Sequence, residues 1–350
     1  MDLKTINTPY KIKNLALKNR IVMAPMCQYS VEKEDGVPNN WHFVHYVSRA
    51  VGGTGLVMME MTDVDPDGRI INQDLGLWSD EQKPAYKKIV SEIHKQGAKV
   101  GIQIAHAGRK AEDALQPVAP SAIAGSALAE ETKHGELNLP HALTVEEIKK
   151  IIEQFKQAAK RAVDIGFDTI EIHGAHGYLL QQFMSPSSNK REDEYGKYLS
   201  KFGVEVIRAV KSVVPEGTPL FFRISAIEYV DDGYGLDHSL KMAEAFEKAG
   251  VDAFHVSSGG EGVPETLKPG NYPAYQVPLA RAFKEKFDIP VIAVGMLNDP
   301  KVAEATLSNN DADLVAVARG MLNDPYWSLH AIKAVTHEVE PPVQYSRGIR

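Results

Sequence analysis

The sequence contains almost no cysteine and no long apolar run. Cys27 is the only cysteine in 350 residues, so neither an intramolecular disulfide nor a cysteine-ligated iron–sulfur cluster is possible within this chain. No apolar stretch approaches the roughly 18 residues that a membrane-spanning helix needs, and the first residues lack the pattern of a signal peptide. These absences predict a cytoplasmic location and no membrane partner.

Charge of one sign is not concentrated anywhere in the chain. The 39 basic and 46 acidic residues are interspersed and leave a formal net charge of -7. Without a basic stripe, nucleic acid is a poor choice of partner. The apolar share of 43% and the charged share of 24% are ordinary for a globular protein, and the length allows a large core.

A short β-branched run, a polar loop and a longer amphipathic stretch recur along the sequence. We predict strands at 20–24, 55–62, 99–105, 168–173, 220–225, 253–257, 290–294 and 313–318. Helices are predicted at 43–51, 79–96, 144–165, 201–214, 238–249, 276–287, 300–307 and 326–337. Thr144 and Glu147 have the spacing of a capping box, as do Ser79 and Gln82.

This alternation predicts an α/β fold with a parallel sheet. A closed (β/α)8 TIM barrel is its simplest form, and an open doubly wound sheet is the alternative. No linker divides residues 1–350, so we expect a single domain. The connections after strands 3, 4 and 6 are long (106–143, 174–200 and 258–275), and they follow strands on the face where barrel active sites form.

Strand parity indicates which side chains point into the barrel. Alternate residues of a strand face opposite sides, and the apolar faces of three strands should meet the helices. Gln103, Glu171, His173 and Arg223 then point inward. Because an unpaired buried charge is costly, Glu171 and Arg223 on adjacent strands are expected to pair. The four polar groups indicate either a structural core network or a ligand-filled mouth.

The fourth strand runs into His173-Gly174-Ala175-His176-Gly177-Tyr178. Two histidines three residues apart occur in metal sites, but no third ligand stands at a suggestive spacing, and we assign no metal. Two imidazoles and a phenol are also a suitable set for polarising and protonating a carbonyl compound. A purely structural role is the third reading of this motif.

The last two strands lead into a candidate phosphate site. Gly295 follows the seventh strand, Arg319 follows the eighth, and Ser258-Gly259 follow the sixth. Loops after strands seven and eight of barrels commonly bind phosphate through backbone N–H groups, and arginine adds a bidentate contact. The alternative is that these are only turn residues. Cys27, just beyond the first strand, is either inert packing or part of the same mouth.

Together these segments resemble the Old Yellow Enzyme family of FMN-dependent ene-reductases, in its bacterial, thermophilic-like class. The similarity runs nearly end to end and is carried by ordered segments. They are residues 19–27 (NRIVMAPMC), 103–110 (QIAHAGRK), 173–178 (HGAHGY), 185–186 (SP), 189–196 (NKREDEYG) and 344–348 (QYSRG).

The resemblance implies an NAD(P)H dehydrogenase with tightly but non-covalently bound FMN. NADPH or NADH would reduce FMN, and the reduced flavin would transfer hydride to the β-carbon of an α,β-unsaturated carbonyl compound. Tyr178 would protonate the α-carbon, and His173 and His176 would bind the substrate carbonyl. Tyr29 would line the substrate site. The residues implied to bind the cofactor are Ala24, Pro25, Met26, Cys27, Met61, Gln103, Arg223, Ser258, Gly259, Gly295, Ala318 and Arg319.

More specific roles also follow from the resemblance. Arg223 would stabilise negative charge on the reduced flavin, Arg319 would hold the phosphate, and Cys27 would tune the flavin potential. After Pro341-Pro342 the chain cannot continue as helix, so an extended tail is expected at 340–350. In this class the arginine matching Arg347 reaches a neighbouring subunit's active site, which implies a homodimer or homotetramer. The segment after Gly196 is shorter than in relatives.

Three other functions compete with the ene-reductase. A dienoyl-CoA reductase or amine dehydrogenase needs an iron–sulfur cluster and extra domains, which one cysteine and 350 residues do not supply. A barrel lyase or aldolase would use the phosphate site for a sugar phosphate, but no lysine is found at an inward strand position. A non-catalytic flavin-storage protein would have no need of Tyr178.

Overall fold

Eight parallel strands close into a barrel. The computed structural model describes residues 5–125, 138–261 and 268–348. Each strand pairs with the next in parallel, and the first also pairs with the last, so the sheet closes on itself and the open-sheet alternative is excluded. The barrel strands are β3 (Ile21–Met23), β4 (Leu56–Asp63), β6 (Lys99–Ala105), β9 (Thr169–Gly174), β10 (Leu220–Ser225), β11 (Ala253–Ser257), β12 (Val291–Ala293) and β13 (Leu314–Val317).

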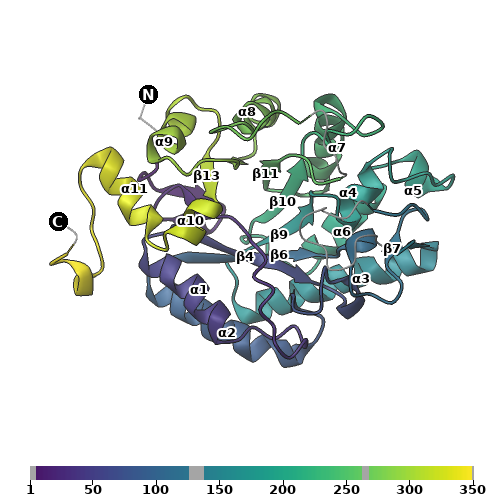
Figure 1. The fold of residues 1–350 in the computed structure, drawn as a ribbon, viewed down its shortest axis with the longest axis horizontal. Coiled ribbons are helices and arrows are strands. Elements are labelled where there is room, and N and C mark those ends of the chain that lie inside the picture. The colour runs from purple at the N-terminus through teal and green to yellow at the C-terminus, as the bar shows by residue number, and fades with distance from the viewer. Residues whose placement is uncertain (1–4, 126–137, 262–267, 349–350) are drawn as a thin grey trace.

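A ring of helices surrounds the barrel (Figure 1), and every predicted helix is present. They are α1 (Asn40–Val51), α2 (Lys83–Lys95), α3 (Val145–Ile165), α6 (Lys201–Lys211), α7 (Leu236–Ala249), α8 (Val277–Lys286), α9 (Pro300–Ser308) and α11 (Trp327–Thr336). The chain therefore has the predicted (β/α)8 TIM-barrel fold. Three short helices were not predicted: α4 (Leu179–Met184), α5 (Glu194–Lys197) and α10 (Arg319–Asn323).

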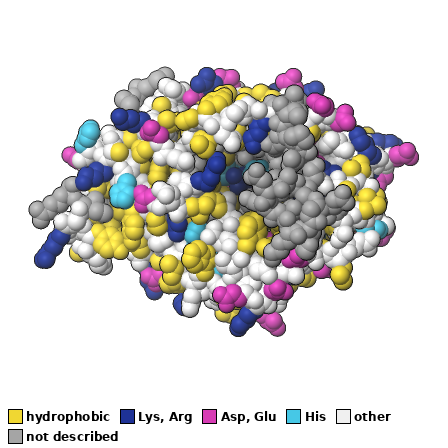
Figure 2. All heavy atoms as spheres, viewed as in Figure 1, with side chains coloured by type: hydrophobic (Ala, Val, Ile, Leu, Met, Phe, Trp, Pro, Cys, Tyr) yellow, Lys and Arg dark blue, Asp and Glu magenta, His cyan; other side chains and the backbone are white. Residues whose placement is uncertain are grey.

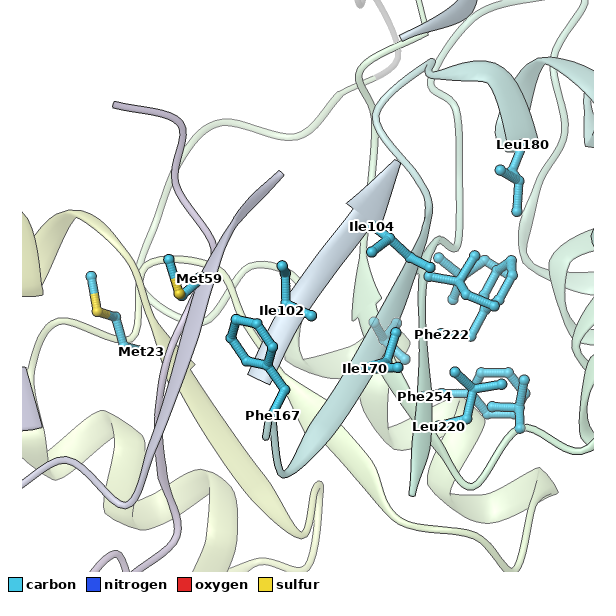
Figure 3. Close-up of a cluster of buried hydrophobic side chains, with 14 of the residues drawn as sticks. Met23, Met59, Ile102, Ile104, Phe167, Ile170, Leu180, Leu220, Phe222 and Phe254 are labelled. Carbon is cyan, nitrogen blue, oxygen red and sulfur yellow. The ribbon is translucent and has the colours of Figure 1, made fainter. Parts of the chain in front are cut away.

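The apolar faces of the strands pack against these helices, as strand parity predicts. Ile102, Ile104, Ile170 and Phe222 lie in one buried cluster with helix residues such as Phe155 and Phe246. Figure 3 shows the strand side of this cluster. With these faces turned outward to the helices, the alternate residues of β6, β9 and β10 are left to line the inside of the barrel.

A two-stranded hairpin packs against the N-terminal ends of the barrel strands. Strands β1 (Tyr10–Ile12) and β2 (Leu15–Leu17) pair antiparallel and were not predicted from the sequence. Their buried side chains Ile12, Leu15 and Leu17 form one apolar cluster with inward residues such as Leu56 and Phe221. This end of the barrel is thus filled by side chains, and a ligand must bind at the opposite end.

The three long connections carry short elements of their own. The 106–143 connection holds a 3-10 turn, η3 (Gly108–Lys110), and the strands β7 (Val118–Ala119) and β8 (His141–Ala142); residues 126–137 lie outside the described part. The 174–200 connection holds α4 and α5. In the 258–275 connection, residues 262–267 also lie outside it.

The C-terminal tail projects from the body of the molecule (Figure 1) but is not extended throughout. Val343–Tyr345 form a 3-10 turn, η4, in which the Tyr345 amide donates to Pro342 O at 2.8 Å. Helix α11 ends at Thr336, where His337 has a φ of 63°, and no helix continues through Pro341 and Pro342. The η4 turn satisfies backbone groups that an extended tail would leave to water. Among the described residues, no helix is long and apolar enough to span a membrane.

The capping box at the start of α3 offers a test of the local fold. Thr144 Oγ1 accepts from the Glu147 amide at 3.3 Å, and Glu147 Oε2 accepts from the Thr144 amide at 2.7 Å. Thr144→Ala removes one acceptor and should lower the free energy of unfolding by about 1 kcal/mol, measured by urea denaturation. Thr144→Ser keeps the hydroxyl and serves as the control. Equal losses in both variants would contradict a capping role.

Candidate active site

A polar network fills the inside of the barrel. Gln103 Nε2 donates to Glu171 Oε1 at 2.7 Å, and His255 Nδ1 lies 2.8 Å from Glu171 Oε2. All three side chains are buried. Burial opposes ionisation of Glu171, but His255, Arg223 and Gln103 together hold its pKa below the usual value. A buried carboxylate thus has both oxygens satisfied.

The predicted ion pair between Glu171 and Arg223 does not form. Glu171 uses its oxygens on Gln103 and His255 instead. Arg223 is in register with His173, two residues beyond Glu171 on β9. Inward side chains of alternate barrel strands share a layer, so Glu171 of β9 meets His255 of β11, while Arg223 of the strand between lies nearer the mouth. The sequence analysis missed His255, although parity between Phe254 and Val256 would have indicated it.

Arg223 carries donors that nothing in the described protein accepts. Its side chain is buried, and its Nε has no hydrogen-bond partner among the described residues. A guanidinium has five N–H donors, and leaving them unpaired in a protein interior is costly. The arrangement therefore calls for a polar or anionic ligand at the mouth, close to where the flavin ring is expected.

His173, His176 and Tyr178 lie together beside Arg223. The His173 ring is 5.2 Å from the His176 ring and 5.0 Å from the Tyr178 ring, measured between centroids. His176 has a φ of 61°, and the following Gly177 has 74°, so the backbone turns sharply and returns Tyr178 to the same side. His176 Nε2 lies 2.7 Å from Ser257 Oγ. The three predicted catalytic side chains are therefore adjacent.

Burial sets the protonation of this group. Desolvation and the nearby Arg223 lower the pKa of His173 and of His176 well below 6.5, so both imidazoles are neutral at neutral pH. Burial raises the pKa of Tyr178 well above its usual value, with Cys27 and Tyr29 adding to the effect. Neutral N–H groups and a protonated phenol are suited to polarising a carbonyl group and donating a proton.

The segment after β3 forms the other wall. Cys27 is partly buried and packs with Tyr178 against an apolar cluster that includes Met61 of β4 and Ala105 of β6. Tyr29 is more exposed and has a φ of 49°. Burial and the carboxyl groups of Asp74, Glu60 and Asp63 raise the pKa of the Cys27 thiol, which makes Cys27 a poor nucleophile at neutral pH.

The predicted phosphate residues gather at the ends of β11, β12 and β13. Gly295 has a φ of 114°, and a Cβ there would come within 2.3 Å of Gln276. Ser258 Oγ donates to Gln276 Oε1 at 2.6 Å, and Gly259 has a φ of 73°. Arg319 follows Ala318 at the start of α10, with Nη2 3.1 Å from Met296 Sδ. Basic side chains also lie near the centre of the face in Figure 2.

These groups fit an elongated ligand with a phosphate at one end and a polar ring at the other. Left-handed glycines let a ligand approach the backbone closely, although the Gly259 amide already donates to Ile227 O at 2.7 Å, and Arg319 supplies a cation. Arg223 supplies unpaired donors toward the ring end. Ser258, Gly259, Gly295 and Arg319 thus follow barrel strands at the same end as Arg223, an arrangement that would suit FMN. Among the described residues, no group of three or more His, Cys, Asp or Glu is arranged to hold a metal.

Three buried carboxyl groups near Cys27 were not predicted. Glu60 Oε1 accepts from Tyr46 OH at 2.8 Å, and Asp74 Oδ2 accepts from the Ile70 amide at 2.7 Å. Neither carboxyl oxygen of Asp63 has a hydrogen-bond partner within the described part of the chain. The register shifts between Met59 and Met61, which puts Glu60 in a β-bulge. Alternation along 55–62 could not reveal the bulge, and Asp63 lay one residue beyond the predicted strand.

These carboxyls predict how stability depends on pH. Burial raises the pKa of Glu60 to about 8 and of Asp74 to about 7. The folded state therefore keeps protons that the unfolded state loses above about pH 4, and the free energy of unfolding falls as pH rises toward about 8. The thermal midpoint should be a few degrees lower at about pH 8 than at about pH 6.

The double variant Glu60→Gln/Asp74→Asn should reduce this difference in thermal midpoint. Glu92→Gln is the control, because Lys95 and Gln96 lower the pKa of Glu92 and its titration lies below this range. An unchanged slope in the double variant would show that the two carboxyls are ionised in the folded protein.

Comparison with known proteins identifies the family of the chain. The model of the NADH:flavin oxidoreductase / NADH oxidase family matches residues 5–338. An NADPH dehydrogenase of Listeria monocytogenes is 46% identical over 346 residues, covering 97% of both chains, and one of Geobacillus sp. is 44% identical, covering 98% of both. The solved structure of morphinone reductase has a TM-score of 0.81 at 27% identity, covering 98% of this chain and 93% of its own.

The family match spans nearly the whole chain, and the fold agrees with it. FMN is the cofactor that this family implies, and the relatives named NADPH dehydrogenase support the use of a nicotinamide. The chain therefore belongs to the NADH:flavin oxidoreductase / NADH oxidase family, the Old Yellow Enzyme family that its sequence resembles, and is a flavin oxidoreductase.

Proposed function

We propose that this protein reduces the carbon–carbon double bond of α,β-unsaturated carbonyl compounds in the cytoplasm, with NADPH or NADH as the transient electron source. When bound, FMN would supply the hydride, drawn from the nicotinamide, that reduces the β-carbon of the alkene. The observation that carries this proposal is the grouping of His173, His176 and Tyr178 at the mouth, with ring centroids about 5 Å apart. No other group in the described mouth offers both carbonyl donors and a proton donor.

The side chains of this group have complementary roles in the proposed reaction. His173 and His176 donate hydrogen bonds to the substrate carbonyl oxygen, which draws electron density from the β-carbon. Because both imidazoles are neutral, they act as oriented dipoles and do not compete with the phenol as acids. Tyr178 donates its proton to the α-carbon. Tyr29, at the more exposed edge, lines the substrate site.

We assign the cofactor contacts to two ends of the mouth. Ala24, Pro25, Met26, Cys27, Met61, Gln103 and Arg223 surround the ring, and Arg223 offsets negative charge that develops on it. Ser258, Gly259, Gly295, Ala318 and Arg319 hold the phosphate. Binding is tight and non-covalent, and Cys27 tunes the flavin potential. A yellow preparation with a flavin absorption spectrum supports this assignment, and a colourless protein after FMN addition would instead support the lyase.

Replacing the proton donor should separate the two half-reactions. Tyr178→Phe keeps the ring that packs on His173 but removes the acid, so alkene reduction should slow by about 100-fold or more. Flavin reduction by the nicotinamide should hardly change, because no protein proton is transferred in it. Stopped-flow absorbance of the flavin follows each step. Equal slowing of both steps would rule out the assignment of Tyr178 as the donor.

We also propose a homodimer or homotetramer in which Arg347 enters the substrate site of a neighbouring subunit. Residue 347 lies on an exposed tail whose Val343 and Tyr345 side chains are 85% and 40% exposed. The contact between Tyr345 OH and Tyr326 OH, at 3.1 Å, ties the tail to α11 without burying it. A tail that leaves its own barrel in this way is available to a second copy.

Shortening the tail tests this assembly. Truncation after Pro342 and the single change Arg347→Ala should both raise KM for enones or nicotinamide several-fold and leave FMN bound. Lys301→Ala removes an exposed positive charge from α9, outside the tail, and is the control for loss of charge. Steady-state kinetics and light scattering provide the readouts. A fully active monomer at the assay concentration would refute the proposal.

A further inference from the structure

Asp63 is a buried carboxylic acid without a hydrogen-bond partner. It ends β4, where it is in register with Ala105 of β6 and Gly76 of β5. Its side chain is 0% exposed, and neither Oδ1 nor Oδ2 has a hydrogen-bond partner among the described residues. Such a group is expensive to bury and contributes nothing to folding by pairing. Its position therefore requires a reason outside stability.

The register places Asp63 on the cofactor side of the sheet. Met61 is in register with Gln103, whose side chain joins the inner network, and Asp63 is two residues further along the same strand. Alternate residues share a face, so Asp63 points inward at the level of the mouth. Ala105, its neighbour across the strand pair, belongs to the apolar cluster on which Cys27 and Tyr178 pack.

Through its register partner Ala105, Asp63 borders the apolar cluster on which Cys27 and Tyr178 pack. Its core is Met61, Ile70, Ala105, Ala107 and Ala111, all buried. Charges across such a medium interact more strongly than in water. A proton lost from Asp63 would therefore oppose the loss of a proton from Cys27 and from Tyr178, and the reverse also holds.

Other ionisable groups face the same region and must be counted. Around Asp63 these are Asp74, Arg69, Asp65 and Glu60. Tyr178 also faces Tyr29 and Asp74, and Lys110 Nζ lies 5.7 Å from its ring centroid. Asp74 differs from Asp63 because two backbone amides, of Ile70 and Ile71, bind it. Asp63 thus accepts no hydrogen bond from a described residue, and the positive charge of Arg69 is the one favourable charge that faces it.

We propose that Asp63 is a positioning residue that acts through charge on Tyr178 and Cys27: as its carboxyl ionises with rising pH, it keeps the phenol and the thiol protonated. The part that concerns Tyr178 rests on the function proposed above. Keeping the phenol protonated extends the pH range over which the donor is competent. Keeping the thiol protonated prevents a negative charge beside the flavin, where the reduced ring is itself anionic.

The single cysteine makes this proposal measurable without catalysis. Because Cys27 is the only thiol in the chain, its alkylation by iodoacetamide reports one group. In the FMN-bound enzyme, Asp63→Asn keeps the size and removes the charge. The apparent pKa of the thiol should fall by about one unit, which gives about tenfold more thiolate at a fixed pH below that pKa. Mass spectrometry across a pH series gives the rate.

A matched control separates charge from packing. Asp67→Asn removes the same charge four residues away on an exposed turn and should leave the alkylation midpoint unchanged. A packing change at residue 63 would alter the alkylation rate by the same factor at every pH, whereas a charge effect moves the midpoint. Asp63→Ser gives a second neutral side chain, and flavin absorbance with circular dichroism confirms that each variant is folded and loaded.

The alkene half-reaction provides the second readout. Its rate should decline at high pH as Tyr178 loses its proton, and in Asp63→Asn that decline should begin about one unit lower. If Tyr178→Phe reduces alkenes normally, the proton-donor assignment fails, but the thiol midpoint still tests the charge of Asp63. An unchanged or raised thiol midpoint in both neutral variants would overturn the proposal.

Discussion

The site depends on one buried carboxylate, Glu171, and the two side chains that bind it. A negative charge inside a barrel is tolerable only when both oxygens are satisfied, and Gln103 and His255 satisfy them. The consequence is that Arg223 is not used up in a core ion pair. Its donors remain available at the mouth, while Glu171 still stabilises its charge from a distance. A direct Glu171–Arg223 pair would have left less for an anionic ring to bind.

Burial and nearby charge also set the protonation of His173, His176 and Tyr178. Arg223 and burial keep His173 and His176 neutral, and burial keeps Tyr178 protonated. These effects share one main cause: the side chains at the C-terminal ends of β9 and β10 are buried away from water. The mouth therefore has two halves of different character. One, around Arg223 and Arg319, presents cationic side chains and suits an anion. The other, around Glu60, Asp63 and Asp74, holds buried carboxyl groups whose pKa values burial raises.

Much of the fold could be predicted because the signals were local and repeated. Each barrel strand contains β-branched residues and is followed by a helix. The side chains of Ile102 and Ile170 face the helices, so the neighbouring Gln103 and Glu171 could be predicted to point into the barrel. Parity between Phe254 and Val256 indicates that His255 points inward, but not that it binds Glu171, because strand tilt decides which strands share a layer. Glu60 was hidden by a bulge, which parity does not anticipate. The short helices α4, α5 and α10 have fewer residues than a periodic pattern needs to be recognised.

The β1–β2 hairpin closes the N-terminal end of the barrel. Because Ile12, Leu15 and Leu17 pack into that end, a ligand can enter the barrel only from the opposite end. In the function proposed above, the nicotinamide and the alkene would therefore enter and leave by the same opening. Two substrates that shared one binding position there would exclude each other, and each would inhibit the step that uses the other.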